Sequence, residues 1–388
     1  MSFASQFDAL HQQAMQATAL DDFGAMDYVE PMKLLLADYD RYNDFTEAGK
    51  QIVSGWVMGA LIGRLFAHKG FKDHPRFTGA SVKQPLIILG MVRTGSTALL
   101  KLLASDPANL SLPYWLGSTP MPRPPRDTWE SNPWYQATVK GLADFYQANP
   151  QLRNIHEMIA DQADECRIVI DHTFWSSGLS STASVPTYTD WCIRGDARYA
   201  YQYHRKVLGL IAGEDARRWV LKDPSHIYGL DSLLSVYPDA RIVFTHRDIM
   251  TSMASGASLT LEVRRMRDAN LDMLQHGREH LYQWGKVLDK TEKVRRQHDP
   301  AQFFDVHMQQ LRRDPLGTVE AIYRHFDIPL SEHSRQAMEQ HLATDTTPRP
   351  GAHEYSAADF GLTEKNVYAG IGDYYERSME INGPYAKT

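Results

Sequence analysis

The chain contains only two cysteines in 388 residues, Cys166 and Cys192. Two cysteines are too few for a disulfide framework in a chain of this length, and their spacing does not match that of metal-ligating cysteines. We therefore expect both thiols to be reduced and buried.

Long apolar runs are also missing. The two longest, residues 56–63 and 86–92, fall far short of the roughly 18 residues that a membrane-spanning helix needs. Residues 1–20 have no basic start, apolar core or cleavage site of a secretory leader. These absences predict a soluble, cytoplasmic protein with no membrane span.

The sequence has no large excess of one charge. It carries 41 Lys and Arg against 47 Asp and Glu, which gives a net charge of −6. This balance excludes the broad basic surface of a nucleic-acid binder, so any anion site must be local. A hydrophobic fraction of 43% and an aromatic fraction of 11% exclude disorder as the main theme.

What the sequence does contain is an alternation of short apolar strands with helical patterns. Helical spacing over residues 1–80 predicts a helical N-terminal extension. Apolar runs predict strands at residues 86–90, 219–222, 241–245 and 303–306, and helical patterns follow them at 97–105, 226–236, 250–297 and 315–326. This alternation predicts an α/β domain over residues 81–388, a P-loop-type three-layer fold with a central, mostly parallel sheet.

Residues 108–218 form a long insertion between the first two strands. Six of the 20 prolines lie between Pro113 and Pro133, which predicts an extended loop there. Five of the eight tryptophans also fall within the insertion: Trp115, Trp129, Trp134, Trp175 and Trp191. These rings either line a pocket for an apolar or ring-bearing substrate or pack a second helical layer.

The strongest local motif is the segment from Gly90 to Thr97, between a predicted strand and a predicted helix. Two glycines five positions apart let backbone amides wrap an anion, and the helix that follows adds its positive end. The spacing is that of the nucleotide-triphosphate loop GxxxxGK[ST], but Ser96 stands where that loop has lysine. Arg93 supplies a cation instead, so the segment predicts a phosphate or sulfate site.

A second motif follows the strand at 241–245. Arg247 lies at the carboxyl end of this strand, and Ser255 lies about two turns into the next helix. An arginine and a hydroxyl that converge in this way predict a second anion site. No acidic residue ends an apolar strand, which leaves no clear magnesium ligand.

Two further candidates lie at or shortly after the end of the strand at 219–222. Lys222 is a candidate for stabilising charge on a transferred group, and His226 is a candidate base.

Together these residues resemble the sulfotransferases that use 3'-phosphoadenosine 5'-phosphosulfate (PAPS), in particular their bacterial branch. The loop from Gly90 to Thr97 resembles the family's 5'-phosphosulfate loop, and Arg247 with Ser255 matches the family's 3'-phosphate pair in type and spacing. The stretch WVLKDPSHIYGLDSLLSVYPDARIVFTHRD and the C-terminal residues 353–375 are also similar to this branch. The resemblance covers residues 85–388 and leaves residues 1–80 without a counterpart.

The resemblance implies transfer of a sulfuryl group from PAPS to an acceptor hydroxyl, without a metal. It implies donor binding by residues from the loop and from the second motif: Arg93, Thr94, Gly95, Ser96, Thr97, Arg247 and Ser255. Arg93 and Lys222 would stabilise the developing charge. The segments around His156 and Glu165 resemble the family's acceptor pocket, so His156 is the first candidate for the base, followed by Glu165, His172 and His226.

Other interpretations stay open. A P-loop kinase or other phosphotransferase is favoured by the glycine spacing and disfavoured by Ser96, and a nucleotide-binding protein without catalysis is the third alternative. The acceptor is expected to be a small molecule, either a phenol, a steroid-like alcohol, a lipid-like hydroxyl or a carbohydrate. The basic stretch from Arg264 to Arg267 is expected to be a solvated helix face. The sequence leaves the oligomeric state open.

Overall fold

The computed structural model describes residues 2–79, 82–150, 153, 157–345 and 356–385. The chain divides into two compact units. Unit 1 contains Met1–Val82, Leu112–Ala216 and Glu262–Leu271, and unit 2 contains Lys83–Ser111, Arg217–Leu261 and Asp272–Thr388. The N-terminal helical segment and most of the insertion therefore belong to one unit, and the strands belong to the other.

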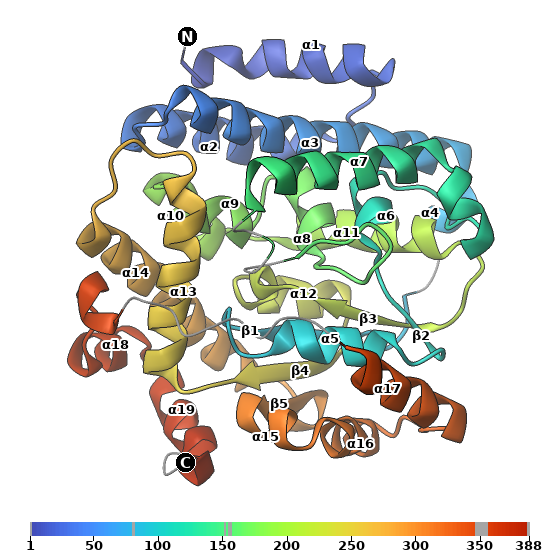
Figure 1. Cartoon of the computed structure of the whole chain (residues 1–388), viewed down its shortest axis with the longest axis vertical. Coiled ribbons are helices and arrows are strands. Elements are labelled where there is room, and N and C mark those ends of the chain that lie inside the picture. Colours follow the sequence, from blue (N-terminus) through green and yellow to red (C-terminus); the bar gives the residue numbers. More distant parts are fainter. Residues whose placement is uncertain (1, 80–81, 151–152, 154–156, 346–355, 386–388) are drawn as a thin grey trace. The chain divides into compact units, whose positions relative to one another are not determined.

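Unit 2 is built on a five-stranded parallel sheet with the strand order β2-β3-β1-β4-β5 (Figure 1). The strands are β1 (Leu86–Gly90), β2 (Asn109–Leu110), β3 (Arg218–Lys222), β4 (Arg241–His246) and β5 (Phe303–His307). The four strands expected from the sequence are all present, which confirms the α/β fold. The edge strand β2 was not expected, because two residues are too few to produce a strand pattern.

The central strand β1 explains where a ligand site can form. All five of its residues are buried, as expected for a strand that is covered on both faces. Leu86 pairs with Val220 of β3 on one side and with Arg241 of β4 on the other. The chain thus extends the sheet in opposite directions from β1, and ligands of open α/β sheets bind beyond the carboxyl ends of the strands at such a switch point.

The helices of unit 2 connect and cover these strands. α5 contacts β1 and β3, and α19 contacts β4 and β5. The helices are α5 (Ser96–Ala104), α12 (Leu230–Val236), α13 (Ile249–Arg265), α14 (Met273–Arg295), α15 (Met308–Arg313), α16 (Pro315–His325), α17 (Glu332–Thr344), α18 (Glu364–Gly370) and α19 (Tyr374–Asn382), and α13 ends within unit 1.

The single helical pattern expected over residues 250–297 is two helices, α13 and α14. A new helix starts at Met273 because the Asp272 carboxylate caps it, accepting hydrogen bonds from the backbone amides of Leu274 and Gln275. Apolar periodicity continues across the break, and this is why the pattern alone did not reveal it.

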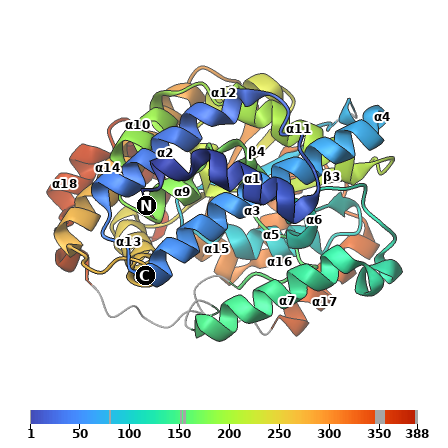
Figure 2. The same cartoon turned by 90° about the horizontal axis from the view of Figure 1, so that it is seen from above.

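Unit 1 is helical, as expected for residues 1–80. α1 packs against α3, and α2 packs against α10 (Figure 2). The helices are α1 (Phe7–Thr18), α2 (Val29–Tyr42), α3 (Glu47–Asp73), α4 (Pro75–Thr78), α6 (Tyr114–Ser118), α7 (Pro133–Ala148), α8 (Arg167–Ile170), α9 (Ser177–Ser181), α10 (Pro186–Arg194) and α11 (Arg198–Ala212).

The tryptophans of the insertion serve mainly to pack unit 1. Trp115 and Trp129 are buried and meet edge to face, with ring centroids 5.2 Å apart. Trp175 is also buried, whereas Trp134 is 42% exposed. At least three of the five tryptophans of the insertion therefore pack a helical layer, which was one of the two roles open for them.

The basic stretch from Arg264 to Arg267 is a solvated face only in part, because Arg265 is exposed, as expected, whereas Arg264 and Arg267 are buried. Arg264 is buried and donates a hydrogen bond to the carbonyl oxygen of Ala183 at 2.6 Å. Arg267 is fully buried, with its guanidinium 4.7 Å from the centroid of the Trp56 ring. Burial lowers the pKa of Arg267 to about 10. The sequence could not reveal this burial, because a buried arginine and an exposed arginine in a basic stretch give the same pattern.

Both cysteines are buried and neither forms a disulfide, as expected, and burial raises the pKa of the Cys192 thiol to about 12. Among the described residues, no helix is long and apolar enough to cross a membrane.

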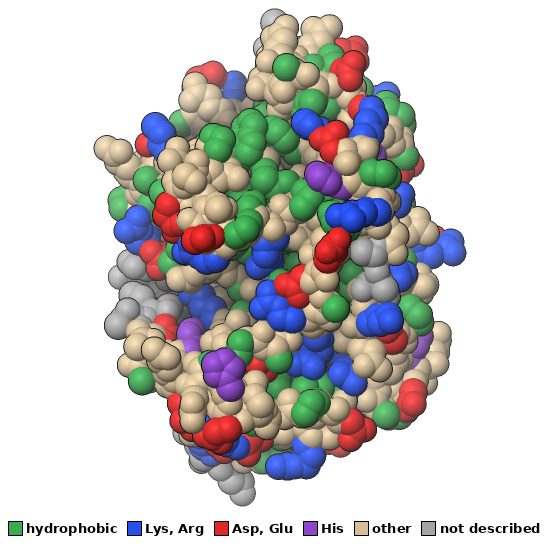
Figure 3. Space-filling view, turned by 90° about the vertical axis from the view of Figure 1, so that its right-hand side faces the viewer, with side chains coloured by type: hydrophobic (Ala, Val, Ile, Leu, Met, Phe, Trp, Pro, Cys, Tyr) green, Lys and Arg blue, Asp and Glu red, His purple; other side chains and the backbone are tan. Residues whose placement is uncertain are grey.

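On the face drawn in Figure 3, Lys and Arg side chains are interspersed with Asp and Glu side chains, and several basic ones gather near the middle of the view. No broad single-sign surface covers this face.

Candidate active site

The loop between β1 and α5 has the backbone that its glycines predicted. Gly90 and Gly95 have φ angles of +145° and +88°, and Arg93 between them has a φ of +71°. A Cβ atom on Gly90 would lie 2.5 Å from the carbonyl oxygen of Thr245, so only glycine fits where the loop passes β4. A left-handed arginine is uncommon, and such residues gather at ligand sites, where the surrounding structure holds them in place.

The loop meets the second motif directly. The Arg93 Nε atom donates a hydrogen bond to the Ser255 hydroxyl at 3.1 Å. Arg247 donates from Nη1 to the carbonyl oxygen of Arg93 at 3.3 Å. The two motifs that the sequence places far apart are thus brought together beyond the carboxyl ends of β1 and β4, in unit 2.

A third arginine, Arg312 near the end of α15, adds to the positive charge here. The pKa of Arg93 is lowered by burial and by Arg312, and the pKa of Arg247 is lowered by burial, Arg312 and Arg93. Among the residues that the structure describes, none of these three guanidinium groups forms an ion pair with a carboxylate. The cluster therefore favours a bound anion, which would relieve the repulsion between like charges.

Sequence reasoning missed Arg312. The signal that could have found it is the basic pair Arg312-Arg313, which follows the end of the fourth predicted strand by one short helix. Because parallel strands end at the same edge of a sheet, cations shortly after any of them are candidates for one site.

The hydroxyls of the loop differ in their surroundings. The Thr94 hydroxyl is buried, with Met91 O and Thr245 Oγ1 each at 2.7 Å, so it holds the loop together. Thr97 lies in the first turn of α5, and its hydroxyl accepts a hydrogen bond from Lys222. The Ser96 hydroxyl makes no hydrogen bond with any other described residue. Ser96 and Thr97 thus remain candidates for anion contact.

Lys222 lies next to the loop. It ends β3, where it pairs with Ile88 of β1, and its side chain is almost fully buried. Its Nζ atom is 3.0 Å from Thr97 Oγ1. A buried cation at the start of α5 can stabilise negative charge that develops on an anion held by the loop.

His226 is also in unit 2, in a short 3₁₀ helix at Pro224–Ile227. Its side chain is fully buried. Complete burial leaves no exposed face for a substrate proton, which favours a structural role.

The remaining base candidates belong to unit 1. His172 is buried, its Nδ1 lies 3.1 Å from the Tyr203 hydroxyl, and burial together with Arg64 lowers its pKa to about 3. A general base works best with a pKa near the working pH, so these contacts favour a packing role. Glu165 is partly exposed and lies 3.6 Å from the Arg167 Nε atom. His156 lies outside the described residues.

Known proteins resemble this chain over nearly its whole length. A model of the sulfotransferase family matches residues 85–332. The crystal structure of sulfotransferase STF1 from Mycobacterium tuberculosis H37Rv is 38% identical, with a TM-score of 0.88, and the match covers 96% of this chain and 99% of that one. Sulfotransferase STF9 from Mycobacterium avium is 27% identical, with a TM-score of 0.85 and coverage of 97% and 95%.

This coverage leaves out only 4% of the chain, so the likeness to STF1 extends into residues 1–80, for which the sequence had suggested no counterpart. No match is found among curated proteins.

Proposed function

Because this chain belongs to the sulfotransferase family, we propose that it transfers the sulfuryl group of PAPS to a hydroxyl of a small-molecule acceptor and releases 3',5'-adenosine bisphosphate. The observation that carries the proposal is the contact of Arg93 with Ser255 and Arg247 in a cluster of arginines without carboxylate partners. PAPS carries anionic groups at two positions and so suits a site with more than one cation.

In this proposal the loop holds the phosphosulfate. The loop amides and the first turn of α5 face the anion, Arg93 contacts its outer oxygens, and Ser96 and Thr97 supply hydroxyls. Arg247 and Ser255 hold the 3'-phosphate. Arg312 adds positive charge to both contacts.

The proposed reaction is an in-line displacement at sulfur. The acceptor oxygen forms a bond to sulfur while the bond from sulfur to the 5'-phosphate oxygen breaks, and the bisphosphate leaves with that electron pair. Arg93 and Lys222 stabilise the charge on the sulfuryl oxygens and on the leaving oxygen. A base takes the acceptor proton, so atoms and charge balance without a redox step.

The base and the acceptor are assigned to residues 108–218, most of which lie in unit 1. His156 remains the first candidate for the base, and Glu165 is second because it is partly exposed. Loss of a general base typically lowers turnover about 10²- to 10⁴-fold. Substitution of His156, Glu165, His172 and His226 in turn should therefore identify the base by one large loss. Most tryptophans of the insertion pack unit 1, so the aromatic content does not favour an apolar acceptor over a carbohydrate. The acceptor panel should therefore include carbohydrates as well as phenols, steroid-like alcohols and lipid-like alcohols.

The decisive experiment combines ligand binding with turnover. Isothermal titration should show tighter binding of 3',5'-adenosine bisphosphate than of ATP with magnesium, and labelled PAPS should transfer its sulfuryl group to at least one acceptor of the panel. Preference for ATP with magnesium would favour a kinase, and bisphosphate binding without turnover on any acceptor would favour a protein without catalysis.

Lys222→Met tests the chemistry within the same assay. We expect turnover to fall by about 10²-fold while bisphosphate affinity changes little, because Lys222 contacts charge that develops only during transfer. Lys365→Met, at an exposed position of α18, is the matched control and should leave both quantities unchanged.

A further inference from the structure

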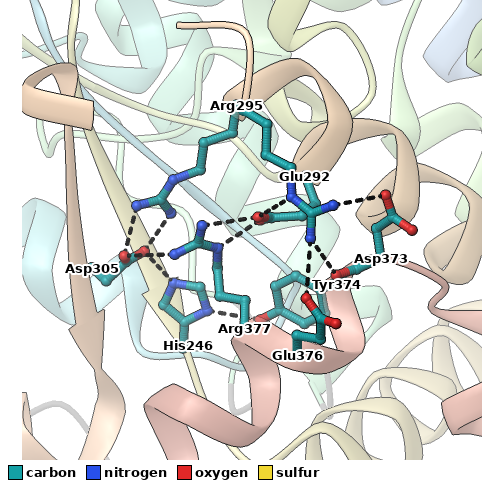
Figure 4. Close-up of polar contacts among 9 residues, drawn as sticks. His246, Glu292, Arg295, Asp305, Asp373, Tyr374, Glu376 and Arg377 are labelled. Atoms are coloured by element: carbon teal, nitrogen blue, oxygen red, sulfur yellow. Dashed lines mark hydrogen bonds and ion pairs between the residues drawn. The ribbon is translucent and has the colours of Figure 1, made fainter. Parts of the chain in front are cut away.

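A dense polar cluster lies in unit 2 where β4 and β5 end (Figure 4). His246 is the last residue of β4, and Asp305 lies in β5. Arg295 ends α14, and Tyr374 and Arg377 come from the first two turns of α19. Two strands and two helices are therefore tied together by side chains at this point.

The hydrogen bonds of His246 fix its orientation and its tautomer. Its Nε2 atom lies 2.7 Å from Asp305 Oδ1, and its Nδ1 atom lies 2.7 Å from the Tyr374 hydroxyl. An ionised carboxylate can only accept, so Nε2 carries the proton and Nδ1 accepts a hydrogen bond from Tyr374. The ring is almost fully buried, and each of its nitrogens has a hydrogen-bond partner.

Asp305 is kept ionised by the arginines around it. Arg295 binds it in a bidentate manner at 2.6 and 2.7 Å, and Arg377 Nη1 lies 3.4 Å from Oδ2. His246 and Arg295 hold the pKa of this carboxyl well below its usual range, against the effect of burial. The order of donors and acceptors from Tyr374 through His246 to Asp305 is thereby fixed.

The helix α19 is held at further points. Arg377 forms a bidentate pair with the buried carboxylate of Glu292 at 2.6 and 2.9 Å. Beside His246 in the sheet, His307 donates a hydrogen bond from Nε2 to Asn382 Oδ1 at 2.9 Å. α19 is therefore attached to both strands. Of these contacts, only the one made by Tyr374 reaches β4.

The residue that follows His246 is Arg247. Its backbone leaves the sheet directly after the fixed imidazole, and its side chain crosses to the Arg93 carbonyl oxygen. The Arg247 side chain therefore starts one residue beyond a strand end whose backbone pairs with β5 and whose imidazole is held by Asp305 and Tyr374. A small displacement of an anion-binding group lowers affinity sharply, because charge-assisted hydrogen bonds depend on geometry.

We propose that Tyr374 and His246 are positioning residues, through which the docked C-terminal helix α19 holds Arg247 in place for the 3'-phosphate of the donor nucleotide. This inference rests on the proposed function, since it assigns the anion at Arg247 to that nucleotide. Neither residue touches the nucleotide. Binding at Arg247 and docking of α19 are then linked, and each strengthens the other.

The test removes one oxygen atom. Tyr374→Phe deletes the hydroxyl that donates a hydrogen bond to His246. Tyr375→Phe is the matched control, because it deletes the hydroxyl of the neighbouring, exposed tyrosine. Affinity for 3',5'-adenosine bisphosphate should fall about fivefold in Tyr374→Phe, the effect of one hydrogen bond, and stay unchanged in Tyr375→Phe. Affinity for 5'-AMP, which lacks the 3'-phosphate, should not change in either variant.

A double-mutant cycle separates positioning from general loss of structure. Tyr374→Phe should have no effect on bisphosphate affinity when Arg247 is already alanine, because the two residues act through one contact. Equal effects with and without Arg247, or an equal loss of 5'-AMP affinity, would overturn the proposal. His246→Gln should reproduce the result, and it replaces Tyr374→Phe if that variant does not fold.

The outcomes also distinguish this inference from the proposed function. If the wild-type protein does not bind the bisphosphate, the proposed function fails and this inference fails with it. If the wild-type protein binds it and Tyr374→Phe binds it equally well, only the inference fails.

Discussion

The guanidinium of Arg93 donates a hydrogen bond to the hydroxyl of Ser255 at 3.1 Å, although the two residues are 162 positions apart in the sequence. One lies in the loop after β1, and the other lies in the second turn of α13. The side chain proposed for the sulfuryl end of the donor thus touches the side chain proposed for the 3'-phosphate. The two motifs thus contact each other, as the proposed binding of one nucleotide with two anionic groups requires.

Arg247 is expected to dominate recognition of the 3'-phosphate. Arg247→Ala should weaken the binding of 3',5'-adenosine bisphosphate more than tenfold, or by roughly 1.4 kcal/mol or more, because it removes a charge-assisted contact. Isothermal titration measures this change. Arg324→Ala, at an exposed position of α16, is the control, and unchanged affinity in Arg247→Ala with a native melting temperature would refute the assignment.

Arg93 is expected to act on turnover more than on product binding. In Arg93→Ala, kcat should fall by a larger factor than bisphosphate affinity, because the bisphosphate lacks the sulfuryl group that Arg93 is proposed to contact. Arg93→Lys keeps the positive charge, and lysine meets the positive φ angle at this position no worse than arginine does, so this variant should recover part of kcat. Equal losses of kcat and affinity in Arg93→Ala would count against this role.

The sheet and the loop between β1 and α5 could be predicted because short-range patterns determine them. A run such as residues 86–90 is apolar at every position, and the glycines after it are needed where the φ angles are positive. The contact between Arg93 and Ser255 could be expected only from the order of parallel strands, which brings their carboxyl ends to one edge.

The remaining features depend on burial, which no local pattern encodes. Arg267 is a fully buried arginine within a basic stretch, and Arg312 is a partner that only the end of β5 brings to the site. His172 was a candidate base from its surroundings in the sequence, yet its packing beside Gly63 and Tyr203 gives it a low pKa. The environment, and not the residue type, decides whether a histidine can act as a base.

Arg312 should add affinity without specificity. Burial lowers the pKa of both Arg93 and Arg247, Arg312 lowers both further, and Arg312→Ala removes this cation. We expect bisphosphate affinity to fall about three- to tenfold and to depend less on salt, because one exposed cation fewer attracts the anion. Titration at two salt concentrations measures both effects. Arg313→Ala, the exposed neighbour, should change neither, and a salt dependence equal to that of the wild-type protein would contradict the role of Arg312.

Buried neutral histidines should make the protein less stable in mild acid. Burial lowers the pKa of His172 and of His204 to about 3, from an unfolded value near 6.5. The unfolded chain therefore binds more protons below pH 6.5, so the stability that the neutral rings contribute is complete above this pH and is lost as the pH falls. Each ring can contribute up to about 1.4 kcal/mol per pH unit in this window.

The measurement is the melting temperature at pH 7.5, 6.5 and 5.5. It should change little between the first two values and fall between the last two, and His172→Asn should show a smaller fall than the wild-type protein. A melting temperature of the wild-type protein that rises from pH 6.5 to 5.5 would show that the buried histidines are not the groups that titrate.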